Sequence, residues 1–146
     1  MEFLQVLNTK HIKFKSLNYQ IATKILKTAS YLNLPDKTCK LCQAEEEDIR
    51  HIFFTCSFLK PVRKEFCDLL NDWRRDIEGP QFNYTSDTII NMKDIKQGLE
   101  YNMISIFKQS IWNSITKHRY EHLPITPYII IQHMYRTLDF FLTYIY

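Results

Sequence analysis

Three of the four cysteines in this chain fall within 18 residues of each other, and a histidine stands among them. The segment from Cys39 to Cys56 has the spacing Cys-x2-Cys-x8-His-x4-Cys. Thiolate and imidazole groups are the ligands that Zn²⁺ takes in structural sites, and four of them complete a tetrahedral shell. The spacing therefore predicts a zinc site whose ligands are Cys39, Cys42, His51 and Cys56.

The alternative interpretation of this segment is three ordinary buried cysteines beside a surface histidine. That interpretation leaves the clustering of the cysteines unexplained. A disulfide framework is disfavoured, because the N-terminus lacks the charged and apolar regions of a secretory leader. Without such a leader, and without any run of 18 apolar residues, we expect an intracellular chain, nuclear or cytoplasmic, that does not enter a membrane.

Apolar residues recur at helical spacing along most of the chain, and strand patterns are weak. We therefore expect a mainly α fold: a small helical domain of about four helices, held together by one zinc knuckle. The expected single domain, 1–146, divides into a basic helix at 10–34, the knuckle at 35–57, a helix at 58–78, an irregular connection at 79–93 and two long helices at 94–146. A short strand at 128–131 and two short strands around Cys39 and Cys42 are weaker alternatives.

The acidic run Glu45 to Asp48 precedes the histidine. Carboxylates suit the positive end of a helix, so we expect the run to be an exposed lead into a helix. Zinc binding in such a knuckle would contribute on the order of 10 kcal/mol of folding free energy.

Positive charge is concentrated near the N-terminus. Residues 1–38 hold six lysines against two acidic residues, a local charge of +4, while the whole chain carries +3. A basic arm of this kind can follow a phosphate backbone, although a solvated helix face has the same composition. The residues that we expect to contact nucleic acid are Lys10, Lys13, Lys15, Lys24, Lys27, Lys40, Arg50 and Lys60.

The motif also resembles a known family. Its parts are Cys39-x2-Cys42, an acidic loop, and then His51-Ile-Phe-Phe-x-Cys56, preceded by a helix with a basic start. Further along stand Lys108, Ile111-Trp112 and Arg119, in that order. These features resemble the C-terminal zinc-binding region of LINE-type (non-LTR) retrotransposon reverse transcriptases. The resemblance covers roughly residues 12 to 142, and the motif is its most specific part.

The resemblance implies a module that helps to hold template RNA or target DNA. The positive charge described above indicates that its contacts would be mainly to phosphate. No polymerase segment with paired aspartates is present, so we expect no enzymatic activity of that kind from this chain. Such a chain would be a fragment, a truncated open reading frame or a co-opted remnant of a retroelement. Phe53 and Phe54 could stack on bases, or they could pack beneath the knuckle.

Two other functions remain open. A zinc-ordered helical module could instead bind a protein partner through the apolar C-terminal helix. A metal-dependent endonuclease is a minor alternative, because Asp87, Asp94 and Lys96 supply two carboxylates and a lysine. However, a nuclease core of that kind needs strands to place these residues, and the region has a helical pattern.

Overall fold

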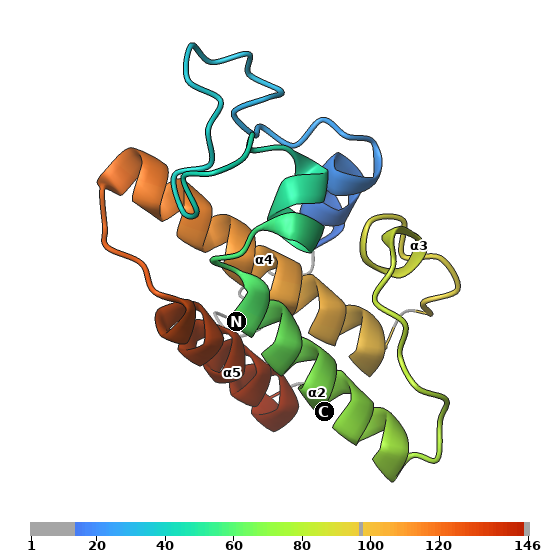
Figure 1. The fold of residues 1–146 in the computed structure, drawn as a ribbon. Coiled ribbons are helices and arrows are strands. Elements are labelled where there is room, and N and C mark those ends of the chain that lie inside the picture. Colours follow the sequence, from blue (N-terminus) through green and yellow to red (C-terminus); the bar gives the residue numbers. More distant parts are fainter. Residues whose placement is uncertain (1–13, 97, 145–146) are drawn as a thin grey trace, which may run out of the picture.

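The computed structural model describes residues 14–96 and 98–144 of the chain (Figure 1). After a helix at 14–22 come the π-helix η1 (His51–Thr55), α2 (Lys60–Asp76), α3 (Ser86–Ile89), α4 (Leu99–Glu121) and α5 (Pro127–Tyr144). The described residues form no named strand, only an isolated antiparallel bridge between Thr38 and Glu46. The prediction of a mainly helical fold is confirmed.

The three long helices α2, α4 and α5 pack against one another and run alongside each other in Figure 1. Their sequences explain where two of them begin. Pro61 lies in the first turn of α2 and Pro127 is the first residue of α5, where the missing backbone N–H costs nothing. Thr126 Oγ1 accepts a hydrogen bond from the backbone N–H of Ile129 and so caps α5. The strand considered at 128–131 is therefore wrong.

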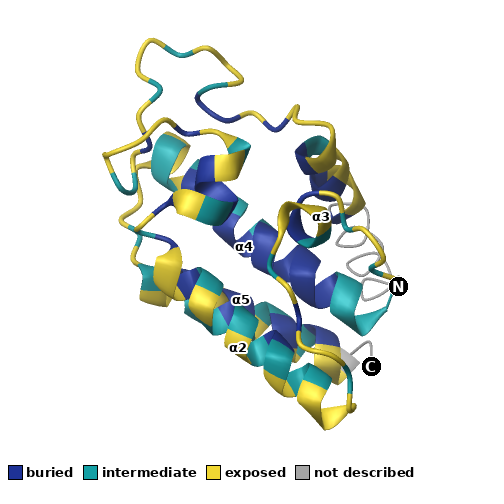
Figure 2. Ribbon diagram, turned by 45° about the vertical axis from the view of Figure 1, so that its right-hand side comes forward, coloured by how far each residue is buried: buried dark blue, intermediate teal, exposed yellow. Residues whose placement is uncertain are grey.

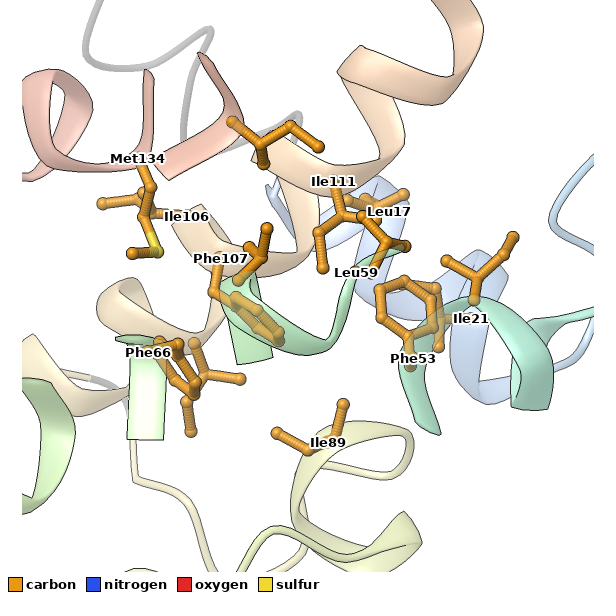
Figure 3. Close-up of a cluster of buried hydrophobic side chains, with 14 of the residues drawn as sticks. Leu17, Ile21, Phe53, Leu59, Phe66, Ile89, Ile106, Phe107, Ile111 and Met134 are labelled. Carbon is orange, nitrogen blue, oxygen red and sulfur yellow. The ribbon is translucent and has the colours of Figure 1, made fainter. Parts of the chain in front are cut away.

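One core joins the long helices to the N-terminal helix and the knuckle. At its centre the rings of Phe66 on α2 and Phe107 on α4 stack, with their centroids 4.2 Å apart. Figure 3 shows Met134 of α5 beside Ile106 at one end of this core, and Leu17, Ile21 and Phe53 at the opposite end. The N-terminal helix and the knuckle are therefore packed into the same apolar core as the long helices.

Helix α4 is the most deeply buried of the long helices. Figure 2 shows it largely as a buried ribbon, whereas α2 and α5 each keep an exposed face. It carries buried polar residues as well as apolar ones, among them Ser105, Ser110 and Lys108. Lys108 is fully buried, and its Nζ donates a hydrogen bond to the carbonyl of Ile89 at 2.8 Å. Burial lowers the pKa of Lys108 to about 7.

The N-terminal helix is shorter than the sequence pattern indicates. It ends at residue 22 and not at 34, and Lys24 follows in the left-handed conformation with φ 61°. The chain then continues in turns, which bury Leu26 and Ala29 but leave Ile25 and Leu32 exposed. The apolar residues here are spaced as in a helix, but those after residue 22 that are buried reach the core from irregular backbone. Lys10 and Lys13 lie outside the described residues.

The start of α4 is also later than predicted. The sequence pattern placed it at residue 94, but Asp94 has a φ of 59° and α4 begins at Leu99, directly after Gly98 with φ 151°. Glycine adopts that backbone conformation without a Cβ clash. Ile95 nevertheless packs against the core from the connection. In the described residues, none of the helices combines the length and apolar character needed to cross a membrane.

Candidate metal centre

A tight backbone turn carries the first two cysteines. The N–H of Glu47 donates to the carbonyl of Lys37, and the N–H of Cys39 donates to the carbonyl of Glu45, both at 2.8 Å. The chain reverses direction between residues 39 and 45, where Gln43 takes the left-handed conformation with φ 57°. The result is a hairpin-like loop with one bridge, in place of the two short strands considered from the sequence.

A π-helical turn carries the other two members of the motif. The N–H of Cys56 donates to the carbonyl of His51 at 2.8 Å, which is the i to i+5 bond of a π-helix. Residues five apart are thereby stacked one turn above the other, so the imidazole and the thiol are brought to the same side. The x4 spacing between His51 and Cys56 suits this turn.

The four side chains of the motif converge. One candidate ligand atom from each of Cys39, Cys42, His51 and Cys56 lies within 4.8 Å of all the others. In a tetrahedral zinc site with metal–sulfur distances of about 2.3 Å, ligand atoms lie about 4 Å apart. The cluster therefore needs only a small contraction to fit such an ion. It is the one group of three or more Cys, His or acidic residues in the described part of the chain that could hold a metal ion.

Burial and thiol pairing set the electrostatics of the cluster. Cys39, His51 and Cys56 are buried and Cys42 is half-buried. The hydrogen bond with Cys56 and, second, burial raise the pKa of the Cys39 thiol to about 12. The same hydrogen bond lowers the pKa of Cys56. A metal ion would have to displace the proton that Cys39 holds, since thiolates are the binding form.

The imidazole of His51 is oriented by two side chains. Its Nε2 lies 3.3 Å from Cys42 Sγ, facing the thiols, while its Nδ1 lies 2.9 Å from Thr55 Oγ1 and 3.1 Å from Glu45 Oε2. Thr55 in turn donates to Glu45 at 3.2 Å. In metal sites, a carboxylate on the remote nitrogen fixes the tautomer and orientation of a histidine ligand. Neither the spacing of the motif nor its residue types single out Glu45 or Thr55 for this role.

The acidic run contains one buried member. Glu47 is 2% exposed, which corrects the prediction that the whole run is an exposed lead into the helix. Its carboxylate forms an ion pair with Arg119 near the end of α4 and accepts a hydrogen bond from the N–H of Ala29 at 2.9 Å. Arg119 also donates to the carbonyl of Lys27. This arrangement attaches the knuckle to α4. The sequence pattern does not indicate it, because Glu47 and Arg119 are far apart in the chain.

Six of the eight basic residues proposed for nucleic acid lie in the described part of the chain. The described ones, all exposed, are Lys15, Lys24, Lys27, Lys40, Arg50 and Lys60. Lys40 forms an ion pair with Asp36 at 2.9 Å. Of the two aromatic residues beside the cluster, Phe53 is fully buried in the core, whereas Phe54 is half-buried.

Comparison with known proteins agrees with this geometry. A family model described as zinc-binding in reverse transcriptase matches residues 5–62, which is less than half of the chain and includes all four converging side chains. No curated protein and no solved structure matches the chain. The matched family and the cluster of three cysteines and one histidine together suggest a metal ion.

Proposed function

We propose that this chain is a zinc-ordered module that binds RNA or DNA mainly through phosphate contacts and has no polymerase activity of its own. We further propose that it corresponds to the C-terminal zinc segment of a LINE-type reverse transcriptase. The observation that carries the zinc assignment is the convergence of Cys39, Cys42, His51 and Cys56 within 4.8 Å. The match to the reverse-transcriptase zinc-binding family supports the link to nucleic acid.

Exposed cations support phosphate binding. Lys24, Arg50 and Lys60 are exposed: Lys24 precedes the motif in the chain, Arg50 stands within it and Lys60 follows it. By ordering the loop at 39–47 and the turn at 51–56, a bound zinc ion would fix the spacing of these charges. Contacts of this kind are insensitive to base sequence and weaken as salt concentration rises, because binding releases counterions from the nucleic acid.

The test pairs zinc content with oligonucleotide binding. The wild-type chain should carry one zinc ion and bind a short single-stranded oligonucleotide with an affinity that falls steeply with salt. Cys42→Ser should lose both properties. Cys67→Ser is the matched control, because Cys67 lies outside the cluster and is half-buried like Cys42. A zinc-loaded wild type that binds no oligonucleotide would contradict the proposal.

A second candidate function, binding of a protein partner, is favoured by the exposed apolar side chains of α5. Tyr128, Ile129 and Leu142 are each between 47% and 66% exposed. Tyr135, on the same helix, is instead partly buried and donates a hydrogen bond to Glu65 at 2.6 Å. Zinc loading without oligonucleotide binding would favour this function. The endonuclease alternative still rests on sequence spacing alone.

A further inference from the structure

A cavity of about 660 Å³ opens beside the candidate metal centre. Its walls come from three separate segments, at 24–31, 48–54 and 86–91. The buried side chains of Leu26 and Ile90 form part of an apolar lining. Cavities of roughly 300–1,000 Å³ accommodate small organic ligands. The volume is therefore sufficient for one nucleotide.

Two aromatic residues line this cavity. Phe54 is half-buried, and its ring packs edge-on against Tyr84 with the centroids 5.3 Å apart, so its position is fixed. Tyr31 is 52% exposed, which leaves ring surface accessible. Aromatic side chains of this kind are the stacking surfaces for unpaired bases in single-strand binders.

The cavity also carries two cations, Lys24 and Arg50, which are both exposed and form no ion pair in the described part of the chain. One acidic residue, Asp48, lies on the same lining, and its Oδ1 already accepts a hydrogen bond from the N–H of His51. The net charge of the lining is therefore positive, which suits a phosphate group.

The wall contains an unsatisfied polar atom as well. Ser30 Oγ is buried and has no hydrogen-bond partner among the described residues, and Ser30 lines the cavity. Buried hydroxyl groups are normally paired, but this oxygen is shielded from solvent, so the base and phosphate contacts inferred below do not include it. Asn91, on the opposite segment, adds an exposed amide that can both donate and accept.

We infer that this cavity binds one nucleotide of a single-stranded nucleic acid, with the base against Tyr31 and Phe54 and the phosphate between Lys24 and Arg50. The inference rests on the proposed function and adds a defined subsite to it. Arg50 and Phe54 flank His51 in the chain. The turn that presents His51 to the thiols therefore also shapes the cavity wall.

The test measures binding of a labelled oligothymidine of about eight nucleotides to the zinc-loaded full chain. Tyr31→Ala should weaken binding by about tenfold, in line with the loss of one stacking contact, and leave the salt dependence unchanged. Arg50→Ala should reduce the slope of log affinity against log salt by about 0.7, the value for one phosphate contact on a single strand.

Two residues of α5 supply matched controls, since α5 contributes no residue to the cavity. Tyr128→Ala removes a tyrosine that is 66% exposed, and Arg136→Ala removes an exposed arginine. Both should leave affinity within about twofold of the wild type. Circular dichroism and zinc content of each variant establish that the fold is retained.

The outcomes separate the two proposals. If the wild type binds the oligonucleotide but the cavity variants behave like the α5 controls, the cavity assignment is overturned and the proposed function stands. If the zinc-loaded wild type binds no oligonucleotide, both are overturned. Loss of affinity confined to Tyr31→Ala and Arg50→Ala would support the cavity as the subsite.

Discussion

The knuckle and the three long helices of this molecule are organised by different forces. In the knuckle, residues 35–57, the backbone is largely irregular, and the side chains that converge are thiols and an imidazole. In α2, α4 and α5, the converging side chains are apolar, and the stacked rings of Phe66 and Phe107 lie at the centre. The first region needs a specific ligand geometry in addition to its buried apolar residues, such as Ile52 and Phe53. The second needs only apolar residues at helical spacing.

The difference implies that the two regions respond to different perturbations. Removing a metal ion should destabilise the knuckle first, whereas opening a cavity in the core should destabilise the three long helices first. The two regions nevertheless share one core, because Ile52, Phe53 and Cys56 of the knuckle are packed in it together with the long helices. Four perturbations test how separate the regions are.

Removal of the metal should have the largest effect. Zinc binding in such a knuckle contributes on the order of 10 kcal/mol, comparable to the stability of a whole domain. With a chelator, backbone amides in 35–57 should lose protection from hydrogen exchange before those of α4. The measurement is exchange by mass spectrometry with and without chelator. Equal loss in both regions would show that they unfold as one unit.

Truncation of the central ring should have the next largest effect. Phe107→Ala removes a fully buried ring stacked on Phe66, so the free energy of unfolding should fall by about 3–5 kcal/mol. Urea denaturation measures this loss. Leu142→Ala, at an exposed position of α5, is the control and should change stability by less than about 0.5 kcal/mol. Folded Phe107→Ala should keep its zinc. A loss of zinc would show that the knuckle and the long helices do not respond separately.

The buried lysine should make stability depend on pH. Lys108 has its pKa lowered to about 7 by burial, while an unfolded chain restores a value of about 10.4. Between these two values the unfolded state binds the extra proton, so stability should rise with pH by up to about 1.4 kcal/mol per pH unit. Below about pH 7 the contribution of Lys108 should be constant.

Lys108→Met isolates this contribution, since other groups also titrate above pH 8. The difference in unfolding free energy between wild type and variant should shrink or reverse in favour of the wild type as pH rises from about 7 to about 10. Urea denaturation across that range measures it. A difference that stays flat with pH would contradict a buried lysine that is neutral in the folded state.

Changes to the orienting groups of His51 should have the smallest effect. Thr55→Val removes the hydroxyl that lies 2.9 Å from His51 Nδ1, and zinc affinity should fall by about tenfold, equivalent to about 1.4 kcal/mol. Competition with a chromophoric chelator measures the affinity. Ser57→Ala, an exposed change just after Cys56, is the control and should leave it unaltered. An unaltered affinity in Thr55→Val would mean that Glu45 alone orients the ring.

The sequence predicted the helices well where apolar periodicity and start signals coincide. Helix α2 begins two residues after the predicted start at 58, with Pro61 in its first turn, and Pro127 is the first residue of α5. The pattern failed at Lys24 and Asp94, where left-handed backbone interrupts it while apolar residues continue at similar spacing. Periodicity records which residues are buried, and an irregular chain can bury them equally well.

The ligand set of the candidate site was likewise accessible from spacing, and its supports were not. Cys-x2-Cys and His-x4-Cys are local patterns, and a turn or one π-helical turn is enough to bring each pair together. Glu45 and Thr55 were hidden because they are ordinary polar residues whose role depends on the direction of the His51 ring. The cavity lining was hidden because it combines three segments.

The ion pair between Glu47 and Arg119 bears on how much chain the knuckle needs. The two residues are 72 positions apart, and the segment that matches the zinc-binding family ends at residue 62. A peptide cut to the matched limits would retain all four thiol and imidazole groups but would lack both the Arg119 guanidinium and the helix α4 that carries it. The sequence motif and the autonomous folding unit therefore do not coincide in this molecule, and α4 is as much a part of the knuckle's structure as the loop that bears the cysteines.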